Sequence, residues 1–340
     1  MHRPFWLRTG AVAIPQASSA LSRLDSYAML QGSTKGITMR FLLTLIFLLI
    51  PLQFAHAQDG RVIKVTASFS ILADTVKKIG GGRVTVTSIA PPDGDAHAYE
   101  AKPKDSVILT GSNLLVLQGL GFDDYAVKLA DAANFSGARV IASKGIQLRK
   151  TEEPPEHHEG HGHDHGSYDP HTWHNPLNMI TAARNIADAL TQIDRAGAAV
   201  YEANLASFTH EMRALDQFAH QQFDKIPPEK RMMITTHDAF AYLGDAYQIK
   251  ILPALGISTV NDNSAQKMAE LIDRARTAGT RAVFLENVSN PTVLNMIAKE
   301  LGTLPSGQLY SDALSAAGPA TTYSDMFRYN IMQIVAAMNK

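Results

Sequence analysis

A repeated alternation of short β-branched runs with helical stretches constrains the fold of this chain most strongly. Four such runs lie between residues 61 and 143, with helical stretches between them: VIKVTAS (62–68), RVTVTSIA (83–90), NLLVLQG (113–119) and ARVIAS (138–143). Strands that alternate with helices predict a parallel sheet with helices on both faces. The alternation returns after residue 230 in RMMITT (231–236), QIKILPAL (248–255), RAVFLE (281–286) and GQLY (307–310). We therefore expect an α/β fold with two similar lobes, each a roughly four-stranded parallel sheet flanked by helices.

The segment between the two groups of strands predicts two long helices. The first is expected from about Leu177 to Ile193, with apolar residues on one face, and the second from about Arg195 to Phe223. A helix of nearly thirty residues spans roughly 40 Å, so it would join the lobes as a rigid strut. The resulting boundaries are an N-terminal lobe at 58–194, a linking helix at 195–224 and a C-terminal lobe at 225–340.

The N-terminal region contains an export signal. Met39-Arg40 precedes the apolar stretch FLLTLIFLLIPLQFA, and AHA follows at 55–57. This order is typical of a cleavable secretory signal at 39–57, and the A-x-A site disfavours the alternative of a membrane anchor. Residues 1–38 are then an extension or a misassigned start. Because the sequence has no cysteine, we expect no disulfide, no thiol catalysis and no lipid anchor on an N-terminal cysteine. The mature chain is expected in the periplasm.

Polar side chains follow several of the predicted strands. Ligands bind beyond the carboxyl ends of the strands in open parallel sheets. In these positions stand His97 in PPDGDAHAYE, His171 and His174 in DPHTWHNP, His237 in THDAF and Asp312 in SDALS. Three imidazoles and one carboxylate from four separate loops would give a tetrahedral site suited to zinc.

A histidine-rich stretch, EHHEGHGHDHG at 156–166, precedes the DPH sequence. Its imidazoles are candidate auxiliary zinc ligands: His157, His158, His161, His163 and His165. Ordering such a segment costs roughly 1–2 kcal/mol per residue, so its zinc affinity should be weaker than that of a preformed site. Two interpretations stay open, a zinc-gathering or zinc-receiving role and a loop with incidental metal affinity.

Seven motifs, four of which contain the candidate residues named above, follow one another along the chain in the order of a known family: DGDAHAYEAKPKD (93–105), GLGFDDY (119–125), DPHTWHNP (169–176), THDAFAYL (236–243), STVNDNSAQKMAEL (258–271), VFLENVSNP (283–291) and LYSDALS (309–315). With them the chain resembles, over residues 61–340, the solute-binding proteins of bacterial ABC importers for zinc and manganese, the cluster A-I family. The stretch LYSDALSAAGPATTY (309–323) is especially similar to zinc-specific periplasmic members whose importers work with a metallochaperone.

The resemblance implies a metal ion buried in the cleft between the lobes. Residue by residue, it places ligands at His97, His171, His237 and Asp312, and it leaves His174 outside the ligand set. The AHAYE sequence departs from the usual proline-histidine context of the first ligand. Manganese-binding members carry a glutamate at the third position, so His237 favours zinc.

The expected function is therefore high-affinity zinc capture in the periplasm and delivery to the membrane permease of an ABC zinc importer. A periplasmic zinc chaperone is a further candidate partner, and we expect a monomer. The net charge of -1, without a block of basic residues, excludes a nucleic-acid partner.

The alternatives to this function are a manganese- or iron-binding member of the same family, or a secreted zinc hydrolase. We expect no enzyme, because a catalytic zinc keeps one position open and needs a nearby base, whereas Asp312 would fill that position. Glu286 and Asn287 are expected to line the cleft or to hydrogen-bond a ligand.

Overall fold

The computed structural model describes residues 62–151, 167–259 and 265–340. The predicted extension at 1–38, the signal at 39–57 and the histidine-rich stretch at 156–166 lie outside these residues. Among the helices of the described segments, none combines the length and the hydropathy that crossing a bilayer requires.

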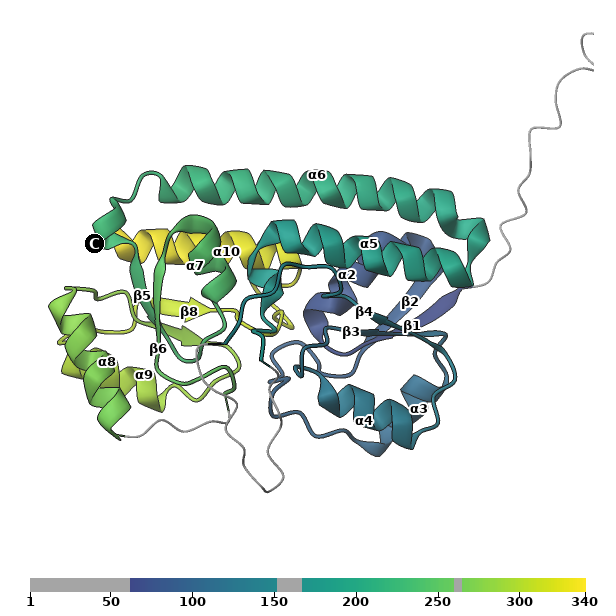
Figure 1. Ribbon diagram of the computed structural model, residues 1–340, viewed down its shortest axis with the longest axis horizontal. Coiled ribbons are helices and arrows are strands. Elements are labelled where there is room, and N and C mark those ends of the chain that lie inside the picture. Colours follow the sequence, from purple (N-terminus) through teal and green to yellow (C-terminus); the bar gives the residue numbers. More distant parts are fainter. Residues whose placement is uncertain (1–61, 152–166, 260–264) are drawn as a thin grey trace, which may run out of the picture. The chain divides into compact units, whose positions relative to one another are not determined.

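The N-terminal lobe is built on a four-stranded parallel sheet of order β2-β1-β3-β4. Its strands are β1 (Ile63–Ala67), β2 (Val84–Ser88), β3 (Leu114–Leu117) and β4 (Ala138–Ile141). The central strand β3 is the apolar run LLVL, and all four of its residues are buried. Figure 1 shows α2 (Ser70–Gly80) on one face of this sheet, and α3 (Pro103–Thr110) and α4 (Asp124–Ala132) on the other.

The C-terminal lobe contains the other four predicted strands, but their pairing is looser. The strand β5 (Met232–Thr235) pairs with β6 (Lys250–Pro253), and β7 (Phe284–Glu286) pairs with β8 (Gly307–Leu309), all in parallel. A single parallel bridge from Ile234 to Val283 joins the two pairs. The chain turns tightly just before β7, where the Val283 N–H donates to the Arg281 carbonyl at 3.0 Å, so little extended backbone is left to pair with β5.

Four helices complete this lobe: α7 (Ala241–Tyr247), α8 (Ala265–Thr277), α9 (Thr292–Glu300) and α10 (Tyr323–Met338). A cluster of buried apolar residues from β5, β6, α8 and α9 forms a small core of its own. The α/β class and the parallel sheet flanked by helices, both predicted from the alternation of strands and helices, are confirmed.

Two long helices follow the N-terminal sheet along the chain, and the second of them connects the lobes. The side chain of Asn175 accepts a hydrogen bond from the Leu177 N–H at 2.9 Å and caps α5 (Pro176–Ile193). A 3-10 turn, Arg195–Gly197, follows, so α6 (Ala198–Phe223) begins three residues later than the pattern predicts.

The helix α6 extends across both lobes (Figure 1). Its 26 residues correspond to about 39 Å at the helical rise. Its buried residues recur every three or four positions and form one face: Tyr201, Leu205, Phe208, Met212, Leu215, Ala219 and Phe223. That face packs on α5 and α2 of the N-terminal lobe and on α10 of the C-terminal lobe.

Candidate metal centre

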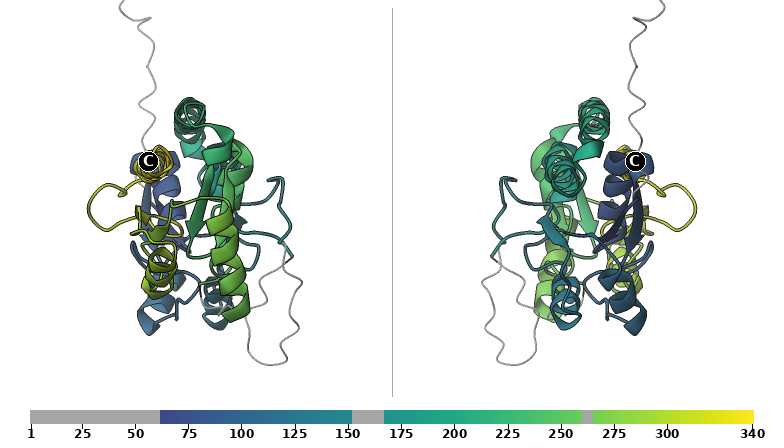
Figure 2. Two further views of the ribbon diagram at one scale, coloured as in Figure 1. Left: turned by 90° about the vertical axis from the view of Figure 1, so that its left-hand side faces the viewer. Right: turned by 90° about the vertical axis from the view of Figure 1, so that its right-hand side faces the viewer.

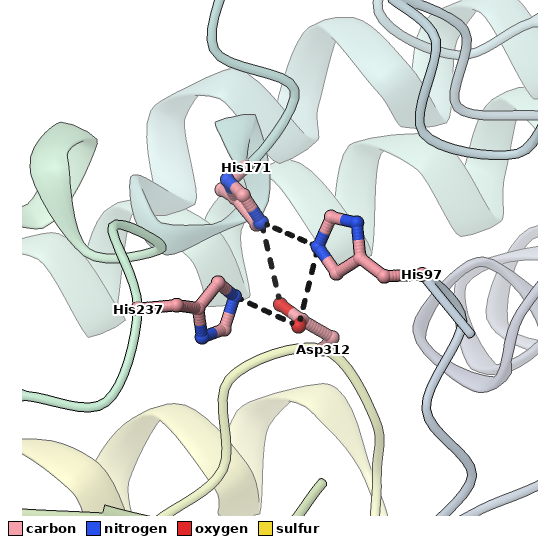
Figure 3. A group of neighbouring side chains, drawn as sticks. All are labelled: His97, His171, His237 and Asp312. Atoms are coloured by element: carbon pink, nitrogen blue, oxygen red, sulfur yellow. Dashed lines mark hydrogen bonds and ion pairs between the residues drawn. The ribbon is translucent and has the colours of Figure 1, made fainter. Parts of the chain in front are cut away.

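Four loops, two from each lobe, bring their polar side chains to one point (Figure 3). His97 lies in the loop between β2 and α3, and His171 lies directly before the 3-10 turn Thr172–His174. His237 follows β5, and Asp312 follows β8. His97 is 5% exposed and the other three side chains are fully buried. The structure thus brings together the four residues that the sequence analysis selected.

Four of the separations between donor atoms of this group are close to those that a small tetrahedral ion requires. Nε2 of His97 lies 3.2 Å from Nε2 of His171 and 3.6 Å from Oδ2 of Asp312. His171 Nε2 lies 3.7 Å from Asp312 Oδ1, and His237 Nε2 lies 3.1 Å from Asp312 Oδ2. One donor atom from each residue lies within 4.8 Å of all the others. Zinc bonds of about 2.0–2.2 Å give a tetrahedron with edges of roughly 3.3–3.6 Å, and the four separations of 3.1–3.7 Å bracket this range.

A carboxylate orients each of two histidines. Asp169 Oδ1 accepts hydrogen bonds from the backbone N–H of His171 at 2.9 Å and from its Nδ1 at 2.8 Å. Glu286 accepts from the backbone N–H of His237 at 3.1 Å and from its Nδ1 at 2.5 Å. When Nδ1 donates to a carboxylate, Nε2 keeps its lone pair, and in both residues Nε2 faces the centre of the group. The expectation that Glu286 hydrogen-bonds a candidate ligand is confirmed.

The charges of the group reinforce each other. Burial alone would raise the pKa of Asp312, but the neighbouring His237 and His171 lower it well below its usual range. Burial alone would lower the pKa of His237, but the charges of Glu286 and Asp312 raise it well above its usual value. The carboxylates therefore stabilise positive charge at this point of the interior.

Aromatic side chains surround the imidazoles of the N-terminal lobe. The ring of Phe122 lies with its centroid 4.9 Å from that of His97, and the ring of Trp173 lies 5.2 Å from that of His171. Trp173 also packs on Phe69 at 5.0 Å and donates from Nε1 to the Ser311 carbonyl at 2.8 Å. This apolar wall keeps the dielectric low around the group.

His174 lies outside the group of four. It is fully buried, its ring lies 4.3 Å from that of Phe240, and burial lowers its pKa to about 3. The five auxiliary histidines at 157–165 lie outside the described residues. Sequence reasoning missed Asp169, although its place two residues before His171 in the DPH sequence was a usable signal, because it sets the carboxylate within reach of both the ring and the backbone of that histidine.

Both the lobed fold and the buried nitrogen-rich group are features of solute-binding proteins for metal ions. Residues 65–337 match the family described as zinc-uptake complex component A, periplasmic, and the chain belongs to this family. Membership makes it a solute-binding protein rather than an enzyme, as the sequence predicted.

Proteins similar to this chain are named for manganese or for zinc. The chain is similar to the manganese-binding lipoprotein MntA of Bacillus subtilis, with 30% identity over 84% of this chain and 92% of the relative. It is 29% identical to the manganese ABC transporter substrate-binding lipoprotein PsaA of Streptococcus pneumoniae, over 82% and 89% of the two chains. Among solved structures, the periplasmic zinc-binding protein TroA of Treponema pallidum superposes with a TM-score of 0.72 and 26% sequence identity. This match covers 82% of this chain and 99% of TroA. The Mn-bound periplasmic metal-binding protein of Candidatus Liberibacter asiaticus superposes with a TM-score of 0.71 and 26% sequence identity. This match covers 81% of this chain and 99% of that chain.

Proposed function

We propose that this chain is the zinc-binding component of an ABC importer, which captures zinc outside the cytoplasm and delivers it to a membrane permease. His97, His171, His237 and Asp312 are its proposed ligands, and the periplasm is its proposed location. The chain acts as a monomer in this proposal, with a zinc chaperone as a candidate donor. Membership of the zinc-uptake family supports the transport role.

The observation that carries the choice of zinc is the nitrogen of His237 at the third donor position. With it, the donor set is three imidazole nitrogens and one carboxylate, and all four residues are buried. Imidazole is a borderline-soft ligand that suits zinc, whereas manganese prefers oxygen donors, and zinc also stands above manganese in the general order of affinity. The separations of 3.1–3.7 Å between donor atoms support a small four-coordinate ion.

Manganese is the second candidate, and one feature of the site favours it. The two oxygens of Asp312 face different partners, Oδ1 toward His171 and Oδ2 toward His97 and His237. A carboxylate in this orientation can bind an ion through both oxygens, which raises the coordination number toward the values that manganese accepts. The manganese-binding names of MntA and PsaA agree with this candidate.

Competitive titration of zinc and manganese into the untagged, mature protein decides between the two ions. We expect one tight zinc and a manganese affinity lower by orders of magnitude, following ligand softness. His237→Glu replaces a nitrogen by oxygen and should narrow the difference. Equal affinities of the wild type for the two ions would contradict the zinc assignment.

Alanine substitutions test the ligand assignment with a matched pair of neighbouring histidines. His171→Ala removes a proposed ligand and should weaken zinc binding strongly. His174→Ala removes an equally buried imidazole from the same turn and should leave the tight site in place. An equal loss of affinity in both variants would refute the assignment of His171 alone.

A further inference from the structure

A turn that leads to His97, residues 91–95, crosses from the N-terminal lobe to the C-terminal lobe. Asp93 adopts a positive φ of 56° in this turn. Its backbone N–H donates to the Leu314 carbonyl at 2.8 Å, and its carboxylate accepts from the Ala316 N–H at 2.9 Å. Both partners belong to the loop that carries Asp312, so the 91–95 turn is seated on that loop.

The second carboxylate of the turn joins the lobes and holds a proposed ligand at once. Asp95 Oδ2 accepts a hydrogen bond from the hydroxyl of Thr259 in the C-terminal lobe at 2.7 Å. Its other oxygen, Oδ1, accepts from the backbone N–H of His97 at 2.9 Å. A movement of the 91–95 turn away from the C-terminal lobe would therefore carry His97 with it.

We propose that the 91–95 turn is a latch between the lobes that sets the rate of metal exchange, with Asp93 and Asp95 as positioning residues. The inference rests on the proposed function, because the exchanged ion is the one held by the buried group. All four proposed ligands are at most 5% exposed, so an ion enters or leaves only when part of the interface separates. Separation at the latch moves His97 from Asp312 and opens the donor set.

The polarity of the interface indicates that the latch separates first. Asp93 and Ala316 are exposed, and Asp95 and Thr259 are half-buried, so water can replace their hydrogen bonds at small net cost. Interlobe contacts near Trp173 are of another kind. Tyr323 donates to the Trp173 carbonyl at 2.7 Å, and both side chains are buried, so separation there would expose large aromatic surfaces to water.

The test measures zinc release from the loaded, full-length mature protein into excess EDTA by stopped flow. The variant Asp93→Gly/Thr259→Val removes three interlobe hydrogen bonds, those from the Ala316 N–H and Asn287 Nδ2 to the Asp93 carboxylate and that from Thr259 to Asp95. It touches no proposed ligand, and glycine accepts the positive φ of position 93. We expect its release rate constant to rise at least roughly tenfold, as the loss of three hydrogen bonds of small net strength allows. The near-isosteric single variant Thr259→Val should give a smaller rise in the same direction and covers the case in which the double variant fails to fold.

Three comparisons separate a latch from a general loss of structure. Asp131→Asn removes an exposed carboxylate that pairs with Arg139 within one lobe, and its release rate should match the wild type. The visible spectrum of the cobalt-loaded double variant should be unchanged, because the ligands are intact. In the wild type, amide hydrogens of 91–95 and 313–316 should exchange faster without zinc, whereas those of 323–330 should not.

Each result bears on one claim. A release rate equal to that of the wild type in both variants, or an altered cobalt spectrum, overturns the latch. Exchange that increases at 323–330 but not at 91–95 overturns the direction of opening. If the wild type binds no zinc, it is the proposed function that fails.

Discussion

At the scale of single residues, two carboxylates determine which nitrogen each histidine presents to the centre. Asp169 and Glu286 bind Nδ1 of His171 and His237, so Nε2 is the free donor in both. Glu286 is the last residue of the strand β7, and the sequence analysis expected it to line the cleft or to hydrogen-bond a ligand. The pairing of Asp169 with His171 depends on the local turn of the backbone, which residue type alone does not specify.

The charge of Glu286 should contribute to zinc affinity through His237. Glu286→Gln keeps the size of the side chain but removes the charge that makes the imidazole a stronger donor. Loss of such an outer partner typically costs about 10–100-fold in metal affinity. Competition with a chelator of known affinity measures the change, and Glu229→Gln, at an exposed position of the 3-10 turn Pro228–Lys230, is the control. Unchanged zinc affinity in Glu286→Gln would show that Glu286 acts only as an acceptor for backbone N–H groups and that its charge does not contribute to zinc binding.

Zinc binding should release a proton from His237 near neutral pH. The charges of Glu286 and Asp312 raise the pKa of His237 well above its usual value of about 6.5, which favours a second proton, on Nε2, in the metal-free protein. Zinc must displace it, and affinity should therefore rise as the pH increases from 5 to 8. Calorimetry at pH 7 in PIPES and in HEPES, two weakly zinc-binding buffers with different ionisation enthalpies, should report about one proton released per zinc.

A second buried histidine provides the control for this proton count. Burial lowers the pKa of His174 to about 3, which favours the neutral ring at pH 7, and His174→Ala should leave the count unchanged. A binding heat that is the same in both buffers, with affinity flat between pH 5 and 8, would exclude a proton on His237.

At the scale of elements, the short runs named in the sequence analysis located the eight strands of the described residues, whereas the pairing of the strands was less predictable. In the N-terminal lobe, β3 is apolar throughout and lies between two neighbours, so its burial was readable from its residues. In the C-terminal lobe, a single bridge joins Ile234 to Val283, 49 positions apart in the sequence, beside the tight turn before β7. Such nonlocal packing leaves no local pattern.

The histidine-rich stretch and the buried group should be separable elements. Deletion of residues 156–166 should leave one tight zinc, because the donor atoms of the buried group come from elsewhere. Weaker additional equivalents should disappear, because the deletion removes five imidazoles. Zinc titration of the deletion variant measures both effects, and an equally long glycine-serine replacement controls for loop length. Loss of the tight site in both would show that the stretch supplies a primary ligand.

At the scale of the whole molecule, the buried group links two lobes that α6 already holds together. His97 and His171 belong to the N-terminal lobe, and His237 and Asp312 to the C-terminal lobe, so one ion bound by all four joins both. Figure 2 shows the same two lobes from both ends of α6, with the helix along one side of the molecule. The latch at 91–95 and the contact of Trp173 with Ser311 are then parts of one interface that the ion closes.

Zinc should therefore stabilise both lobes as one cooperative unit. A free zinc concentration of about 100 times the dissociation constant adds about 2.7 kcal/mol to the free energy of unfolding. For a domain of this size, that amount raises Tm by about 5–10 °C. Differential scanning calorimetry of the mature protein should show a single transition that moves as a whole. His171→Ala should abolish the shift, and His174→Ala should retain it. Two transitions, of which only one responds to zinc, would mean that the ion is held within one lobe and that the four residues do not act as a single site.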